Sequence, residues 1–470
     1  MTDWTGPGPG PQDQPAWLIR GARPLGGEPA DLLLAGGLIA EVGPEARGAR
    51  VGLPAGAREL DATGLIALPG LVDLHAHLRE PGFEDAETVA SGLAAAAHGG
   101  FTTVCAMPNT NPAIDDPSVL ERVLAAAARS GSPVELLVYG ALTMGRRGES
   151  LAALGELSDA GAIGFSDDGA PIRSSTILRN GLLYAGMLGR PLIDHAEDSA
   201  LTEGAAANDG LVATVLGLHG WPAAAESGPV GRGLAILADV LRDEPRARLH
   251  FTHLSTAAAL DLVRQAKAAG LPVTCDVTPH HLGLTDTWIA GARDWAWRDD
   301  PDPWLGVAQA AAPYDPALRV NPPLRDRSDA SACLAALLDG TADAVATDHA
   351  PHTRVDKAVE FGQAANGISG IETAIGILLA AVDAGRLPLG RAIAALTSGP
   401  AALLQAGGWA GSRGLVEGAP ADLVVIDRSD SWRVEATTLR SKGKNNPLVG
   451  RELPGRVLLT VAGGRLAYEA

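Results

Sequence analysis

The sequence has few aromatic residues, few cysteines and no long hydrophobic run. Aromatic side chains make up only 4% of the 470 residues, so alanine, leucine and valine must fill most of the core. The only cysteines are Cys105, Cys275 and Cys333, and such a sparse, odd set excludes a disulfide framework and favours the cytoplasm. Because no apolar run reaches roughly 18 residues, we expect no membrane-spanning helix.

Positive charge is scarce as well. The 37 Lys and Arg residues face 55 Asp and Glu residues, which gives a formal net charge of −18. Phosphate backbones require a basic face, so we expect no nucleic-acid partner, although a local basic pocket is compatible with a small anionic substrate. The first 17 residues lack the basic and apolar regions of a signal peptide, and their Gly and Pro content predicts a flexible tail.

Short apolar runs alternate with alanine-rich helical segments through the middle of the chain. This alternation predicts a parallel α/β sheet, and eight units are the number that closes a (β/α)8 barrel of the TIM type. An open doubly wound sheet is the alternative. The predicted strands are 71–77, 101–108, 135–142, 162–168, 191–197, 248–255, 272–279 and 342–350.

Both chain ends contain strands and turns, which predicts a small β-sandwich formed from the two ends. The expected domains are a tail plus the first part of the sandwich at 1–66, the (β/α)8 barrel at 67–405, and the rest of the sandwich at 406–470. Residues 284–316 form a long connection with four tryptophans, Trp288, Trp295, Trp297 and Trp304. A lid, an oligomer contact or a local core would each explain it, and we favour packing.

Histidines and aspartates stand at the carboxyl ends of the predicted strands, where barrels build their active sites. His75 and His77 are two residues apart, so an ideal strand points both to one face, where they can hold one metal ion. Asp167 and Asp168 are neighbours, so only one should face the barrel mouth. Each motif alone also fits a core histidine or a helix-capping aspartate.

Three further motifs complete the polar set. His195 ends the fifth strand, and the sixth carries His250 and His253, whose spacing places them on opposite faces, so that one is structural. Asp348 ends the last strand, where a carboxylate can move a proton. Five strands with such ends favour a metal site, because imidazole and carboxylate groups suit Zn²⁺.

These motifs, in this order, resemble the class I dihydroorotases of the amidohydrolase superfamily. The resemblance extends from about residue 30 to the end of the chain. It rests on the stretches PGLVDLHAHLREPG, CAMPNTNP, GFSDDG, IDHAED, FTHLST, VTPHHL, RVNPPLR, ATDHAPH and SKGKNNPLVG.

The resemblance implies roles for particular residues. His75 and His77 would bind one metal with Asp348, and Asp168 would bridge to a second metal. The ligands of that second metal would be His195 and His253. An aspartate at the bridging place is typical of class I dihydroorotases, whereas many relatives have a carboxylated lysine there.

The resemblance also implies a substrate pocket. Arg79 suits a substrate carboxylate, because a guanidinium binds carboxylates in a bidentate manner. Relatives often have Pro-Phe-Gly where this chain has Ala365-Asn366-Gly367, which predicts a more polar pocket wall. The full set of expected substrate contacts is Arg79, Asn109, Asn321, His352, Asn366 and Gly367.

The implied activity is the reversible cyclisation of N-carbamoyl-L-aspartate to L-dihydroorotate in pyrimidine biosynthesis, with a metal-activated hydroxide and Asp348 as general acid and base. We expect one or two Zn²⁺ ions per subunit, with two favoured, a homodimer, and aspartate carbamoyltransferase as a candidate partner. The alternatives are another cyclic amidohydrolase, such as an allantoinase or hydantoinase, and a non-catalytic scaffold for that transcarbamoylase.

Overall fold

The computed structural model describes residues 15–44, 56–299, 312–411 and 414–470. Most of the residues that were predicted to form a flexible tail, and Trp304, lie outside these ranges. In the described part of the chain no helix has both the length and the apolar character needed to cross a bilayer.

The eight predicted strand regions form the barrel, as expected, although the strands are shorter than the apolar runs in the sequence. The third region is divided into two short strands. The barrel strands are β6 (Leu71–Ala76), β7 (Phe101–Ala106), β8 (Glu135–Val138), β9 (Gly140–Ala141), β10 (Phe165–Ser166), β11 (Leu192–Asp194), β14 (Leu249–Phe251), β15 (Val273–Val277) and β16 (Ala344–Val345).

The barrel strands form two parallel arcs, one of order β6-β7-β8 and one of order β16-β15-β14-β11-β10-β9. The first and last strands meet through a parallel bridge between Ala76 and His349. Asp73 strengthens this junction, because its buried carboxylate accepts hydrogen bonds from the backbone N–H and the hydroxyl of Thr347. The junction places the end of β6 beside the end of β16, where the predicted site lies.

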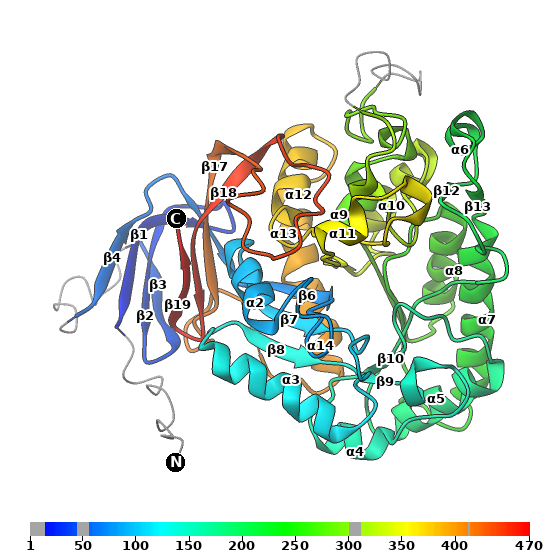
Figure 1. The fold of residues 1–470 in the computed structure, drawn as a ribbon. Coiled ribbons are helices and arrows are strands. Elements are labelled where there is room, and N and C mark those ends of the chain that lie inside the picture. The colour runs from blue at the N-terminus through cyan, green and yellow to red at the C-terminus, as the bar shows by residue number, and fades with distance from the viewer. Residues whose placement is uncertain (1–14, 45–55, 300–311, 412–413) are drawn as a thin grey trace.

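Helices pack around the outside of the strands (Figure 1). Several begin at a Ser, Thr or Asp that accepts a backbone N–H, as Asp116, Thr256 and Asp326 do. The helices are α2 (Val89–His98), α3 (Pro117–Ser130), α4 (Leu154–Asp159), α5 (Ser175–Met187), α6 (Leu211–Leu216), α7 (Ala224–Val240), α8 (Ala257–Ala268), α9 (Pro279–Gly283), α10 (Arg327–Asp339), α11 (Arg354–Lys357), α12 (Ala374–Asp383), α13 (Leu389–Leu396) and α14 (Ser398–Ala406).

The two chain ends build one eight-stranded sheet beside the barrel, with the blue and red strands adjacent in Figure 1. The order is β19-β18-β17-β5-β1-β2-β3, and β4 pairs with β1. The strands are β1 (Trp17–Pro24), β2 (Ala30–Ala35), β3 (Leu38–Gly43), β4 (Arg58–Asp61), β5 (Ile66–Pro69), β17 (Leu423–Arg433), β18 (Glu452–Ala462) and β19 (Arg465–Glu469). The predicted architecture of a barrel plus a small β-domain from both ends is confirmed.

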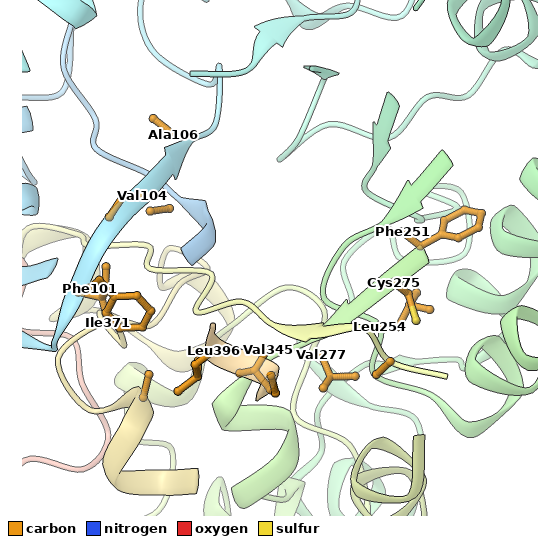
Figure 2. Close-up of a cluster of buried hydrophobic side chains, with 14 of the residues drawn as sticks. Phe101, Val104, Ala106, Phe251, Leu254, Cys275, Val277, Val345, Ile371 and Leu396 are labelled. Atoms are coloured by element: carbon orange, nitrogen blue, oxygen red, sulfur yellow. The ribbon is translucent and has the colours of Figure 1, made fainter. Parts of the chain in front are cut away.

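The largest core fills the space between the barrel strands and their helices (Figure 2). Phe251 and Cys275 belong to it, and Phe251 packs against α7 at Gly233. Neighbouring residues of the same strands point inwards, as the alternation of a strand requires. The inward side chains at the carboxyl ends of the strands are therefore held by a packed outer layer.

The tryptophan-bearing connection contributes to a separate satellite core. Trp288 is fully buried there, and the rings of Trp295 and Trp297 stack at 5.1 Å between centroids. The guanidinium of Arg451 lies 4.0 Å from the centroid of the Trp295 ring, so the connection packs against the C-terminal part of the chain. These contacts agree with the packing role favoured for this segment. The short paired strands β12 (Ala207–Asn208) and β13 (Gly220–Trp221) lie outside the barrel.

Candidate metal centre and substrate pocket

The floor of the candidate site is formed by His75 and His77 at the end of β6. Their register with β7 shifts between Asp73 and Ala76, and such irregularities often re-aim side chains beside active sites. The two Nε2 atoms lie 3.2 Å apart, and both rings are buried. This placement agrees with the expectation that the two histidines point to the same face of the strand.

Asp348 completes a first group of possible metal ligands with these two histidines. One ligand atom from each of the three residues lies within 4.8 Å of the others. Asp348 Oδ1 is 3.1 Å from His77 Nε2 and 3.5 Å from His75 Nε2. Burial opposes ionisation of Asp348, but its polar contact with His77 and the charge of His75 hold the pKa of this carboxyl below its usual range.

Asp168 lies at the centre of a second group, which contains His75 and His253. Asp168 Oδ2 is 3.1 Å from His75 Nε2, and its Oδ1 is 3.4 Å from His253 Nε2 and from His195 Nδ1. His195 Nδ1 is 2.9 Å from His253 Nε2, so it joins the edge of this group. His75 therefore belongs to both groups, which differs from the division of ligands that the family resemblance implied.

The chemistry of these groups fits a divalent cation of the zinc type. The donors are imidazole nitrogens and carboxylate oxygens, and Asp168 Oδ1 is buried without a hydrogen-bond partner. Burial lowers the pKa of His75, but the carboxylate of Asp168 outweighs it and the net pKa is about 9. His195 behaves alike, and Asp168 and Glu197 raise its pKa to about 10 against its burial. The negative charge of these carboxylates therefore favours a cation between the histidines.

Polar partners hold two of these histidines in one orientation. His77 Nδ1 donates to Asn109 Oδ1 at 2.8 Å, which leaves His77 Nε2 facing Asp348. His195 Nε2 donates to Glu197 Oε2 at 2.9 Å, which leaves Nδ1 facing Asp168. Such partners fix the tautomer of a ligating histidine. The sequence interpretation missed Glu197, although its position two residues after His195 was a usable signal.

The two asparagines expected to touch the substrate also hold the metal-facing groups. Asn321 Nδ2 donates to Glu197 Oε2 at 3.0 Å, and Asn109 accepts from His77. Each amide has a second polar end that these bonds do not use, and both residues line the pocket described below. They therefore connect the pocket wall to the histidines.

A pocket of about 160 Å³ opens above the two groups. It brings together every predicted site residue except His75, which is fully buried beneath its floor. Its lining consists of His77, Arg79, Asn109, Asp168, Gly169, His195, His253, Asn321, Asp348, Ala350, His352, Asn366 and Gly367.

Arg79 supplies a positive charge at the pocket wall. Its Nε donates to the carbonyl of Pro351 at 3.1 Å, and burial lowers its pKa to about 10, so it stays charged at neutral pH. His352 lies 3.3 Å away, and burial together with that charge lowers its pKa to about 3. The neutral His352 ring donates from Nε2 to the carbonyl of Asn366 at 2.8 Å. The wall thus combines one cation with neutral polar groups, which suits a substrate carboxylate.

The other strand-end histidines and Asp167 take structural positions. Asp167 accepts from the backbone N–H and the hydroxyl of Thr143, so of the aspartate pair only Asp168 reaches the pocket. His250 bonds to Thr274 and Asp276 beneath the site. His281 Nε2 donates to the carbonyl of Pro322 and lies outside both ligand groups.

Comparison with known proteins agrees with this geometry. The Dihydro-orotase-like family model matches residues 64–244, and the Amidohydrolase family model matches residues 231–467. A dihydroorotase of Anaeromyxobacter dehalogenans (strain 2CP-C) is 45% identical over 433 residues, 92% of each chain. The chain belongs to the dihydroorotase family. A second dihydroorotase, from Geobacter sp. (strain M21), is 40% identical over 96% of this chain and 99% of its own.

Solved structures show the same fold at greater sequence distance. L-hydantoinase (dihydropyrimidinase) from Arthrobacter aurescens superposes with a TM-score of 0.78 over 96% of each chain, at 23% identity. Dihydropyrimidinase from Brevibacillus agri NCHU1002 gives 0.73 at 21% identity, over 97% of this chain and 95% of its own. These likenesses support the barrel architecture alone, whereas membership of the dihydroorotase family, as predicted, rests on the sequence matches.

Proposed function

We propose that this member of the dihydroorotase family interconverts L-dihydroorotate and N-carbamoyl-L-aspartate by reversible hydrolysis of a ring amide. The observation that carries the proposal is the pocket, which is lined by Arg79 together with Asp348 and the histidines of the two ligand groups. Hydrolysis adds water across the bond between the ring carbonyl carbon and the ring nitrogen. The nitrogen leaves with a proton, and the reverse path closes the ring and releases water.

The pocket wall would bind and orient the substrate. Arg79 pairs with the substrate carboxylate, and the free amide ends of Asn109 and Asn321 bond to ring N–H and C=O groups. His352 is held neutral and contributes a hydrogen bond without a competing charge. Asn366 and Gly367 close this side of the pocket, where the backbone N–H of Gly367 is anchored to the carbonyl of Arg319.

His75, His77, Asp168, His195, His253 and Asp348 would hold the metal. When bound, the ions supply Lewis-acid chemistry, which acidifies a water molecule and polarises the amide carbonyl. Asp168 reaches towards His75 on one side and towards His195 and His253 on the other, so it is the group suited to link two ions. We propose zinc as the metal, with two ions per subunit, because the donors are mainly imidazoles.

Asp348 would carry the proton. It lines the pocket with its Oδ1 beside His77, and its depressed pKa keeps it ionised, the form that can take a proton. In ring opening it takes a proton from the attacking water and returns it to the leaving nitrogen. In ring closure the same carboxyl supplies the proton for the departing water.

The setting of the enzyme is a further part of the proposal. All three cysteines are free and buried, which suits a reducing cytoplasm. A homodimer and an association with aspartate carbamoyltransferase are proposed from the family resemblance. Size measurement of the purified chain, alone and mixed with the transcarbamoylase, tests both.

Loss of the dihydroorotate ring absorbance provides the test. Metal-loaded protein should open L-dihydroorotate, lose this activity after chelation and regain it when Zn²⁺ is restored. Allantoin and hydantoin serve as competing substrates, and turnover of either one in preference to dihydroorotate would replace the proposal with another cyclic amidohydrolase. A protein that binds no metal and turns over nothing would favour the scaffold alternative.

Replacement of Asp348 tests the mechanism. Asp348→Ala should lower kcat by at least about 10³-fold with an unchanged thermal midpoint, because positioned acid–base groups contribute on that scale. Asp159→Ala, a change of an exposed aspartate at the end of α4, is the matched control. Near-normal kcat in Asp348→Ala would remove the proton-carrying role.

A further inference from the structure

Asp276 lies directly beneath the two ligand groups, on β15. It is fully buried, and its strand neighbour Cys275 belongs to the outer core between strands and helices (Figure 2). Since strand side chains alternate, Asp276 faces the barrel interior. None of the expected metal or substrate contacts includes it, yet a buried carboxylate needs several hydrogen bonds to offset its desolvation.

The hydrogen bonds of Asp276 come from the segment that bears His253. Its Oδ1 accepts the backbone N–H of His253 at 2.7 Å. Its Oδ2 accepts from His250 Nε2 at 2.8 Å and from the hydroxyl of Thr252 at 3.3 Å. The bond from its backbone N–H stabilises His253 at a φ of +42°, a left-handed backbone conformation that residues other than glycine adopt at a cost.

Thr252 connects the carboxylate of Asp276 to His75. Its Oγ1 lies 2.7 Å from Nδ1 of His75, the histidine that both groups share. A hydroxyl has one proton to donate, and Thr252 donates it to Oδ2 of Asp276. The hydroxyl proton therefore points to Asp276, and its oxygen accepts the proton of His75 Nδ1.

This chain of bonds decides which nitrogen of His75 is bare. A His75 that ligates a metal with its proton on Nδ1 would present the lone pair of Nε2 on the side of Asp168, His77 and Asp348. We propose that Asp276 is a positioning residue for the metal centre: through Thr252 it fixes the tautomer of His75, and through the backbone it fixes His253. One carboxylate thus positions two of the proposed metal ligands, His75 and His253. This inference rests on the proposed metal site.

A pair of matched threonine variants tests this connection. The hydroxyls of Thr252 and Thr274 each contact Nδ1 of a histidine, but the partner of Thr274, at 2.9 Å, is His250, which is outside the ligand set. Thr252→Val should weaken metal affinity by about 10–100-fold, the usual effect of losing a partner of a ligating histidine. Thr274→Val should leave that affinity unchanged, and Thr252→Ser, which keeps the hydroxyl, should restore it.

The readouts are Zn²⁺ affinity by competition with a chromogenic chelator, the thermal midpoint of the metal-free protein, and kcat and KM at saturating metal. We expect Thr252→Val to lower affinity and kcat with little change in KM or in the metal-free midpoint. Asp276→Asn should show the same pattern; if it fails to fold, the threonine pair still decides the matter.

Two outcomes would overturn the inference. Equal metal affinities in Thr252→Val and Thr274→Val would show that the hydroxyl of Thr252 does not position His75, and so would failure of Thr252→Ser to restore affinity. If the unaltered protein bound no metal, the proposed function itself would fail, which is a different result from a missing difference between the variants.

Discussion

The barrel mouth and the terminal sheet are equally well buried and chemically opposite. In the core of the terminal sheet, Trp17, Ile19 and Leu32 are at most 2% exposed and belong to one cluster of buried apolar side chains. In the mouth, His75 and Asp168 are at most 2% exposed, yet they are titratable groups in direct contact. Apolar burial stabilises a fold, whereas packed titratable groups cost desolvation free energy.

The backbone of the barrel mouth is strained as well. Arg79, His253 and Asp348 have φ values of 64°, 42° and 45°, a region that costs non-glycine residues of order 1–3 kcal/mol each. All three residues line the pocket. Strain and buried charge therefore coincide in the part of the molecule that binds and reacts, and the terminal sheet helps to provide the stability that tolerates them. Substitutions in the two regions should separate activity from stability.

The largest expected effect is the loss of His75. His75→Ala removes a ligand that both groups share, so bound metal should fall below that of His77→Ala or His253→Ala. The kcat should fall by at least about 10³-fold, which is roughly 4 kcal/mol of transition-state stabilisation. Metal content by elemental analysis and the dihydroorotate assay measure both. His219→Ala, at an exposed position, is the control, and a loss of metal no greater than in His77→Ala would contradict the shared role.

A truncation in the terminal sheet should give the opposite result. Ile39 is fully buried on β3, and Ile39→Ala leaves a cavity that costs about 2–5 kcal/mol. The unfolding midpoint in denaturant should fall, while kcat for each folded molecule and metal content stay the same. Reduced kcat at temperatures where the variant is folded would show that this sheet also shapes the barrel mouth.

An intermediate effect is expected at Gly367, where the backbone itself forms the pocket wall. Its φ is 151°, and a Cβ there would lie 2.6 Å from the carbonyl oxygen of Ala350. Gly367→Ala should push the wall out of place and raise KM for dihydroorotate about 10-fold, roughly 1.4 kcal/mol, with metal content unchanged. Gly390→Ala meets no atom within 4 Å and is the matched control. An unchanged KM would mean that this wall moves without cost.

The sequence predicted the strands and the pocket better than the connections between the ligands. Periodicity located all eight strand regions because their outward side chains must be apolar to pack against helices, and the polar residues stood out at the strand ends. The strands were too long in the prediction, because the residues that flank the short strands β10 and β16 are as buried as the strands themselves.

The residues that the sequence did not reveal act through other residues. Asp276 and Glu197 look like ordinary strand or turn acids, and only distances show that they hold His253 and His195. His75 is shared between the two ligand groups and lies where the pairing of β6 with β7 shifts register, a shift that the residue pattern does not predict. Spacing predicts which side chains share a space, and three-dimensional packing decides which atoms meet.

The smallest expected effect concerns Lys357, a buried lysine at the end of the short helix α11. Its Nζ donates to the carbonyls of Pro316 and Arg319 at 3.0 Å, and it lies on α11, between His352 and Asn366 in the chain. Burial, followed by the nearby charge of Arg319, lowers its pKa from 10.5 to about 7. Between these two pKa values the unfolded chain binds more protons than the folded protein.

Stability relative to a variant without this amine should therefore rise with pH from about 7 to about 10.5, by at most about 1.4 kcal/mol per pH unit. Lys357→Met keeps the apolar stem and removes the titrating group. The thermal midpoint of the unaltered protein minus that of Lys357→Met should increase between pH 7 and pH 9, as measured in the same buffers. A difference in thermal midpoint that does not change with pH would mean that the two carbonyls keep the Lys357 ammonium charged. The hydrogen bonds to Pro316 and Arg319 would then offset the desolvation cost of burying this charge.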